Sequence, residues 1–359
     1  MEQGGHPEQP GRVPPGACGR RRPARRVTSP GSERDFRPAP WLANCHVQSI
    51  YPSLPLRRPW VGRRCSVLLR ASRAEVVDCG EGVRLLAHRA RQEALGREPA
   101  RRVAVLLHGW EGSADSLYLL SLASLLLENG FEVVRLNLRD HGDSHHLNEG
   151  IFHSCRIAEV VGAVRRLQEL AGGRRVDLAG FSLGGNFALR VAARARGAGI
   201  DLEHVVAICP VIDPAHTLRR LEDGWALYRW YFVRKWRRSL VRKQAAWPSA
   251  YDLEDVLELS TLTDMTRLLA TRYGGYPTLE DYLRGYAIVG DALEGIDCPA
   301  RIIAAADDPI IPAEDLPRLA RPASLSVTLT PHGGHCGYYD AQQGSSWLER
   351  QVLATLTAR

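Results

Sequence analysis

The sequence predicts an α/β fold, with a mostly parallel sheet covered by helices on both faces and a helical insertion late in the chain. Three observations predict it. Short apolar runs alternate with segments of helical periodicity, as in sheets buried on both faces. A serine lies between two glycines where one such run gives way to a helical pattern. Two later runs are separated by about 90 residues, where one helix normally suffices.

The bulk composition suits one large folded domain. The chain has 359 residues, 45% of them hydrophobic, and a formal net charge of +7. Its 47 basic residues include only two lysines, Lys235 and Lys243, so 45 are arginines. Forty acidic residues accompany them, and no basic face repeats at a spacing that fits a nucleic-acid groove. We therefore expect no nucleic-acid partner.

The eight cysteines and the N-terminus bear on the compartment. No Cys-x-x-Cys pair or zinc-module spacing occurs, which is typical of scattered thiols in a reducing compartment. The first 40 residues contain no apolar signal-peptide core, and the longest apolar stretch, residues 117–127, is too short to span a bilayer. The expected location is the cytoplasm.

Composition also divides the chain. Residues 1–37 are rich in Arg, Pro and Gly and poor in large apolar groups, which predicts a disordered arm. The folded domain is expected over residues 38–359.

The expected strands follow in order. "CSVLLRASRAEVVDC" (65–79) and "VRLLAHRA" (83–90) are typical of an antiparallel pair around the turn "GEG". One helix is expected at 114–128 and another after Ser182. A third is expected where apolar residues between Ile157 and Leu167 recur at helical spacing. The further strands are short apolar runs at 103–107, 132–137, 176–180, 204–208, 301–305 and 326–330.

Residues 211–296 form the predicted insertion. It holds twelve of the chain's 25 aromatic residues. A stripe at helical spacing packs down onto the sheet, lines a lid over an apolar substrate, or does both. Its members are Trp225, Tyr228, Phe232, Trp236 and Leu240.

The serine between glycines is the candidate nucleophile. Gly180-Phe181-Ser182-Leu183-Gly184 matches Gly-x-Ser-x-Gly between a strand and a helix, the nucleophile elbow of the α/β-hydrolase fold. Such a corner exposes Oγ at the carboxyl edge of the sheet, where open α/β sheets bind ligands.

Serine needs a base, and in this fold the acid and then the base follow it in the chain. "AADDPIIP" follows the run at 301–305, and we favour Asp308 over Asp307 as the acid. "PHGGHCGYY" follows the run at 326–330, and we favour His335 over His332 as the base, because two glycines precede it.

An oxyanion hole requires two preorganised N–H groups. The amide of Leu183 follows the nucleophile, and the amide of Trp110 lies in the loop "LHGWEGS" after the run at 103–107. The expected substrate pocket contains Trp110, Trp225 and Phe232.

A metal site is the rival interpretation of one loop. "RDHGDSHHLN" holds Asp140, His141, Asp143, His145 and His146. Its place after the run at 132–137 is also typical of a hydrolase loop, which we favour, so no metal is expected.

The motifs together resemble the YheT-like α/β-hydrolases, AB hydrolase family 4, over residues 36–356. "PWLANCHVQSIYPSL" is similar to that family's N-terminal Asn-x-His-x-Gln signature, and "HGWEGS", "GFSLGGN", "DDPI" and "GGHCGY" follow in the family's order. Cys45 and Cys336 stand where the family commonly has Pro and Val. The resemblance implies serine hydrolysis of carboxylic esters by Ser182, Asp308 and His335.

The sequence therefore predicts a serine ester hydrolase that needs no cofactor and acts on short- to medium-chain acyl esters, monoacylglycerol or other lipid esters. The alternative is a ligand-binding or peripheral membrane protein on a hydrolase scaffold. Its membrane contact, expected to be weak, would involve the basic segments 20–26 and 233–243.

Overall fold

The computed structural model describes Met1 and residues 36–341 and 345–358. The predicted arm therefore lies almost wholly outside the described residues. The folded unit runs from Phe36 to the C-terminus, two residues earlier than expected. Phe36 is buried because its ring packs against Tyr338 and Trp347.

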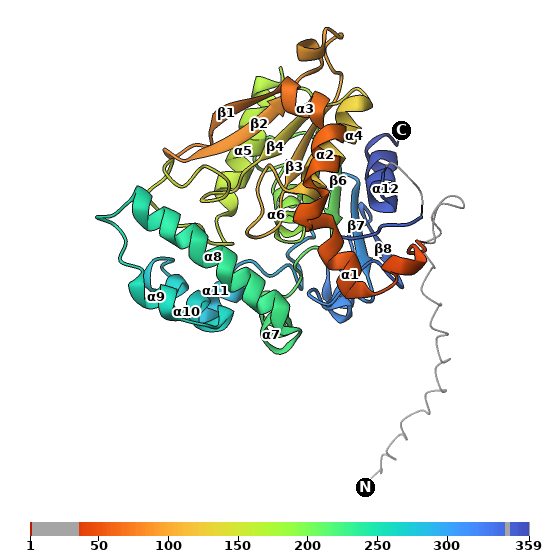
Figure 1. Ribbon diagram of the computed structural model, residues 1–359. Coiled ribbons are helices and arrows are strands. Elements are labelled where there is room, and N and C mark those ends of the chain that lie inside the picture. The colour runs from red at the N-terminus through yellow and green to blue at the C-terminus, as the bar shows by residue number, and fades with distance from the viewer. Residues whose placement is uncertain (2–35, 342–344, 359) are drawn as a thin grey trace. The chain divides into compact units, whose positions relative to one another are not determined.

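An eight-stranded sheet forms the centre of this unit (Figure 1). Its spatial order is β1-β2-β4-β3-β5-β6-β7-β8. The β1–β2 and β2–β4 pairs are antiparallel and the others are parallel, so the mostly parallel sheet is confirmed. The strands are β1 Ser72–Asp78, β2 Arg84–Ala90, β3 Val103–Leu107, β4 Glu132–Leu136, β5 Val176–Phe181, β6 Leu202–Ile208, β7 Ala300–Ala305 and β8 Leu325–Thr330.

One predicted strand is only half correct. Residues 66–71 of the run at 65–79 form helix α3 (Ser66–Ala71), and strand β1 begins at Ser72. Cys65, Leu68 and Ala71 recur at intervals of three and are all buried. That period fits a helix, and it was hidden by the β-branched residues that follow.

Helices line both faces of the sheet. α4 begins at Leu117, three residues later than expected, after a turn between Ser113 and Ser116. The helices flanking the sheet and its N-terminal approach are α1 Cys45–Ile50, α2 Arg58–Arg64, α3, α4 Leu117–Glu128, α5 Ile157–Leu170, α6 Leu183–Ala192 and α12 Trp347–Leu356. Short 3₁₀ helices occupy Pro40–Leu42, Tyr51–Ser53, Pro55–Arg57, Gln92–Leu95 and Ala313–Arg318.

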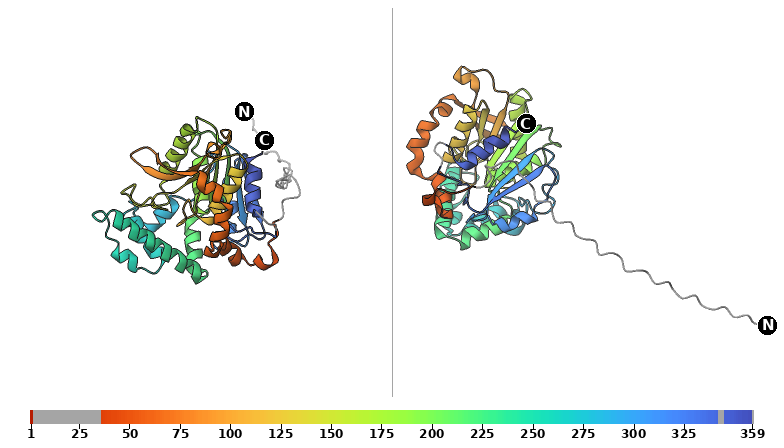
Figure 2. Two further views of the ribbon diagram at one scale, coloured as in Figure 1. Left: turned by 45° about the horizontal axis from the view of Figure 1, so that its top comes forward. Right: turned by 90° about the vertical axis from the view of Figure 1, so that its right-hand side faces the viewer.

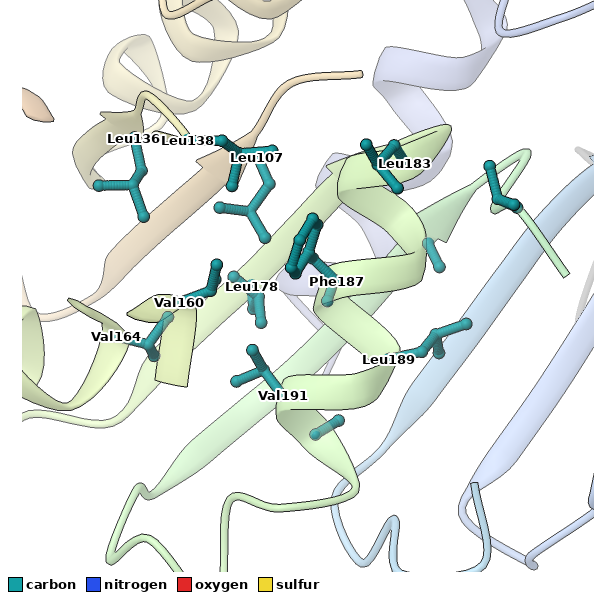
Figure 3. Packing of buried hydrophobic residues seen from close by; sticks show 14 of the residues in the cluster. Leu107, Leu136, Leu138, Val160, Val164, Leu178, Leu183, Phe187, Leu189 and Val191 are labelled. Atoms are coloured by element: carbon teal, nitrogen blue, oxygen red, sulfur yellow. The ribbon is translucent and has the colours of Figure 1, made fainter. Parts of the chain in front are cut away.

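The two faces have separate cores. Alternate residues of a strand point to opposite faces of a sheet. The residues of β3 are buried on both faces. Leu107, together with Leu136 and Leu178, packs towards α5 and α6 (Figure 3). Leu106 packs on the opposite face with residues of α4 and α12, which lie side by side in Figures 1 and 2.

The segment between β6 and β7 is helical, as expected for residues 211–296. Figure 1 shows its long helix α8 crossing beside the loops of the sheet. Its helices are α7 Pro214–Asp223, α8 Ala226–Ala246, α9 Glu254–Glu258, α10 Leu262–Arg272 and α11 Leu279–Arg284. Over residues 36–341 and 345–358, no helix has both the length and the apolar character needed to cross a membrane.

Candidate active site

Ser182 occupies a strained corner between β5 and α6. Its φ of 54° and ψ of −116° lie in a region that side-chain-bearing residues rarely adopt. A Cβ on Gly180 would lie 2.1 Å from the carbonyl oxygen of Gly184, and a Cβ on Gly184 would lie 2.5 Å from that of His108. Only glycines allow this close packing, so the Gly-x-Ser-x-Gly spacing is a steric requirement of the corner.

A chain of two hydrogen bonds begins at the Ser182 hydroxyl. Ser182 Oγ lies 2.9 Å from Nε2 of His335, and Nδ1 of the same ring lies 2.8 Å from Oδ2 of Asp308. Because the carboxylate can only accept, Nδ1 carries the proton and Nε2 is left to accept from the hydroxyl. The structure thus brings together the three residues favoured in the sequence.

The two neighbouring aspartates have different partners. Asp308 is buried, and its Oδ1 accepts hydrogen bonds from the amides of Ile310 and Ile311. Asp307 instead accepts from the amide of Gly334 and faces the exposed His332 ring. Asp308 therefore orients the imidazole of His335, while Asp307 fastens the loop that carries it.

The environment of His335 sets its proton affinity. Burial disfavours the imidazolium form, but the charge of Asp308 and its hydrogen bond outweigh burial, so the pKa of His335 is raised above its usual value. A raised pKa makes His335 a stronger base towards the Ser182 hydroxyl.

Two amides close to Ser182 in the structure have no hydrogen-bond partner among the described residues. Residues 109–112 form a turn closed by the Gly112 amide and the Gly109 carbonyl, with Trp110 inside it. Within the described part of the chain, the amides of Trp110 and Leu183 donate no hydrogen bond. Gly109 approaches so closely that a Cβ on it would lie 3.3 Å from that of Ser182. The two amides predicted as oxyanion donors therefore have no partner within the described residues, and their role stays a prediction.

Buried side chains hold this turn in place. The Tyr118 hydroxyl accepts from the amide of Gly109, and Nε2 of His141 accepts from the amide of Glu111, whose φ is +54°. His108 similarly accepts from the amide of Leu138 and donates through Nδ1 to the Gly109 carbonyl. Burial lowers the pKa of His108 to about 4, so it remains neutral and its Nε2 remains an acceptor.

Residues of the N-terminal Asn-x-His-x-Gln signature, and Ser49 directly after it, hold the loop that carries His335. Gln48 is fully buried and makes two hydrogen bonds to Tyr339, accepting from its amide and donating to its carbonyl. Ser49 Oγ accepts from the amide of His335. Sequence reasoning noted Asn-x-His-x-Gln but assigned Gln48 and Ser49 no role. The motif was the available signal, but its target lies about 290 residues away in the chain.

A large cavity opens at Ser182. Its volume is about 910 Å³. Trp110 lines it and stacks on Phe232 of α8 with ring centroids 5.1 Å apart, while Trp236 meets the same indole edge-on. Glu111 also lines it, and burial raises the pKa of this carboxyl to about 7 although Lys235 opposes the shift.

Trp225 does not belong to this pocket, so one predicted pocket residue is wrong. Its side chain is about half exposed, lies outside the cavity lining and packs edge-on against His46. Trp225 is the extended N-cap of α8, with ψ of 118°. The helical spacing that places Phe232 towards the cavity therefore does not apply to Trp225.

Buried polar contacts fasten α8 over the site. The Lys243 ammonium is 1% exposed and lies 3.0 Å from Oδ1 of Asp140 and 2.6 Å from the Asn148 carbonyl oxygen. Burial raises the pKa of Asp140 to about 6, against the influence of Lys243. Lys235 donates to the carbonyl of Glu111, inside the turn that presents Trp110. The position of α8 is thus coupled to that turn.

The histidine-rich loop at 139–148 uses its polar atoms within the protein. Asp140 binds Lys243, His141 accepts from Glu111, His145 contacts Ser239 and Asp143 pairs with Arg242. These partners connect the loop to α8 and to the oxyanion turn.

Two other groups of possible metal ligands occur among the described residues. One is Cys209, His335 and Cys336, whose histidine already bonds Ser182 and Asp308. The other is Asp213, His216 and Asp315, where Arg318 pairs with both carboxylates.

Replacing Gln48 by Ala should loosen the loop that carries His335. The substitution leaves the N–H of Tyr339 without its partner, at a cost of about 1–3 kcal/mol, and removes one of the two donors to its carbonyl, which keeps the amide of Ala39. We expect a lower thermal midpoint and slower ester hydrolysis. Gln351, which is buried in α12 away from this loop, provides the control substitution. Equal activity losses in the two variants at matched stability would contradict the role of Gln48.

The comparisons with known proteins agree with the fold. A family profile described as alpha/beta hydrolase fold matches residues 103–342. The Escherichia coli (strain K12) protein named "Putative esterase YheT" is 26% identical over 332 residues, covering 91% of this chain and 94% of that protein.

Solved structures share the fold. The esterase Pf2001 of Pyrococcus furiosus superposes with a TM-score of 0.53 at 16% identity, covering 79% of this chain and 89% of that one. Est1E of Butyrivibrio proteoclasticus, solved with ferulic acid, gives 0.52 at 17% identity, covering 79% and 100%. The chain belongs to the α/β-hydrolase fold family and, within it, is similar to the YheT protein of Escherichia coli.

Proposed function

We propose that this protein is a serine hydrolase that cleaves carboxylic esters through a covalent acyl-enzyme. The observation that carries the proposal is the hydrogen-bonded chain from Ser182 through His335 to Asp308, whose Ser182 end lies in a cavity lined by Trp110 and Leu183. The esterase name of the YheT protein, similar along most of its length, supports the same chemistry.

Acylation begins at the strained corner. As Ser182 Oγ attacks the ester carbonyl carbon, Nε2 of His335 takes the hydroxyl proton. The carbonyl oxygen becomes an oxyanion and accepts hydrogen bonds from the amides of Trp110 and Leu183. The positive end of α6 lies at the same place and stabilises the negative charge further.

The imidazolium then completes the reaction. Its Nε2 proton passes to the leaving alkoxide, and the carbon–oxygen bond breaks to leave the acyl group on Ser182. A water molecule, deprotonated by the neutral His335, attacks that acyl carbon. The bond from the carbon to Ser182 Oγ then breaks, the acid leaves, and the imidazolium returns its proton to Oγ. Asp308 holds the ring through Nδ1 and stabilises its charged form during both steps.

The cavity points to an ester with an apolar acyl group. Its aromatic wall of Trp110, Phe232 and Trp236 offers little to a strongly polar chain. Helices α7–α11 act as the lid of this pocket, because α8 supplies two of these three rings. The volume accommodates a medium-chain acyl group of a small or lipid ester.

Asp308→Asn should lower kcat much more than Asp307→Asn. In a serine protease the corresponding change costs roughly 10⁴-fold. The pH profile separates the roles, because Asp308 raises the pKa of His335. Its loss should move the acid limb of kcat/KM to lower pH, whereas Asp307→Asn should leave that limb in place. A larger kcat loss in Asp307→Asn would assign the role to the other carboxylate.

Acyl-chain length tests the function and the pocket together. Burying one methylene contributes about 0.8 kcal/mol, so kcat/KM for p-nitrophenyl esters should rise up to about fourfold per carbon and then level off. Phe232→Ala should flatten the rise, while Trp225→Ala is the matched control outside the cavity. Failure to hydrolyse any of these esters would contradict the function, and a maximum at acetyl would contradict only the apolar pocket.

A further inference from the structure

The mouth of the cavity has an unusual surface. One border of the cavity is formed by Ser53, Leu54, Pro55 and Arg58, in the segment that also contains Leu56, and another by Trp230, Tyr231, Arg234 and Arg238 of α8. Leu56 and Arg58 are exposed on the first side, and Trp230, Tyr231, Arg234 and Arg238 are exposed on the second. We call these six residues the mouth surface.

The exposed residues of α8 form one stripe. Trp230, Tyr231, Arg234 and Arg238 follow one another at intervals that place them on one side of a helix. The buried Val233 and Leu240 occupy the opposite side. The stripe is therefore a continuous outward face, and it carries large apolar rings beside cationic groups.

The two chain segments that carry the mouth surface contain basic residues and no acidic ones. Residues 36–74 contain seven arginines and no acidic residue, and residues 224–251 contain seven basic and no acidic residues. The whole chain has 40 acidic residues, so their absence from both borders is a local feature. Among the described residues, no carboxylate pairs with Arg58, Arg234 or Arg238.

The apolar groups of the mouth surface are exposed as well. The side chain of Leu56 is 89% exposed and that of Trp230 is 57% exposed. Large apolar side chains that gather at a cavity mouth mark an interaction site more strongly than scattered ones. The guanidinium of Arg234 lies over the Trp230 ring, so the cationic and aromatic groups form one patch.

We propose that the mouth surface docks on an anionic phospholipid bilayer. Trp and Tyr rings favour the boundary between headgroups and acyl chains, and arginines beside them attract anionic headgroups. A polyanion such as a nucleic acid would leave Leu56 and Trp230 without an apolar partner, so a bilayer fits the surface better. A docked cavity would open directly onto lipid esters.

This inference deepens the proposed function, because its account of the substrate rests on ester hydrolysis by this protein. Docking itself does not require turnover. The test therefore uses the full chain carrying Ser182→Ala, with sedimentation on vesicles of phosphatidylcholine alone or mixed with phosphatidylglycerol. We expect stronger binding to the anionic vesicles that weakens as salt is added. Arg234→Gln with Arg238→Gln should weaken that binding about 25-fold, since each arginine near such a surface contributes about fivefold.

A matched control has the same charge change elsewhere. Arg101 precedes β3 and Arg196 follows α6, so both are exposed at the amino edge of the sheet, away from the mouth. Arg101→Gln with Arg196→Gln should leave anionic-vesicle binding within about twofold. Trp230→Ala should weaken binding to both vesicle types, because it removes apolar contact rather than charge. Unfolding curves of each variant confirm that the fold persists.

Three results of the vesicle experiments would overturn the proposal. They are no binding to anionic vesicles, undiminished binding by the Arg234 and Arg238 variant, and equal weakening by the control variant. Tighter binding to duplex DNA than to anionic vesicles, lost in the same mouth variant, would also overturn it in favour of a polyanion partner. Ester hydrolysis by the wild type is measured separately, so either proposal can fail without the other.

Discussion

The site depends on the placement of one imidazole ring. His335 is held at Nδ1 by Asp308, at its own amide by Ser49, and by the hydroxyl of Ser182 at Nε2. Gln48 fixes the same loop through Tyr339. These partners come from the beginning, middle and end of the folded unit, so they meet only when the whole sheet has formed. The ring is therefore oriented by tertiary structure, and its raised pKa follows from that orientation.

Backbone strain gathers around the cavity in which this ring lies. Glu111, Asp140, Ser182 and Cys336 all have positive φ although none is a glycine. Each such conformation costs about 1–3 kcal/mol and persists only where its surroundings enforce it. Here the surroundings are buried acceptors and ion pairs, such as His141 beneath Glu111 and Lys243 beside Asp140. The helix over the cavity and the turn below it are consequently fixed by one polar network.

Local patterns predicted much of the fold and the centre of the site. The elbow around Ser182 was predictable because a strand, two glycines and a helix are contiguous, and the parallel strands were visible as apolar runs. The helix at 66–71 was predicted as strand because a short apolar run does not reveal where a helix ends and a strand begins. Trp225 was predicted in the pocket because a stripe at helical spacing does not reveal where its helix begins. The roles of Gln48 and of Asp307 could not be predicted, because their partners are set by contacts distant in sequence.

The central claim is that Ser182 is a nucleophile activated by His335. Reaction of the full chain with a fluorophosphonate, followed by intact mass and peptide mapping, tests it most directly. We predict one adduct per chain on Ser182, none in Ser182→Ala, and a greatly slowed reaction in His335→Ala. A folded wild-type protein that stays unlabelled, carries the adduct on another residue, or reacts equally fast without His335 would contradict the account.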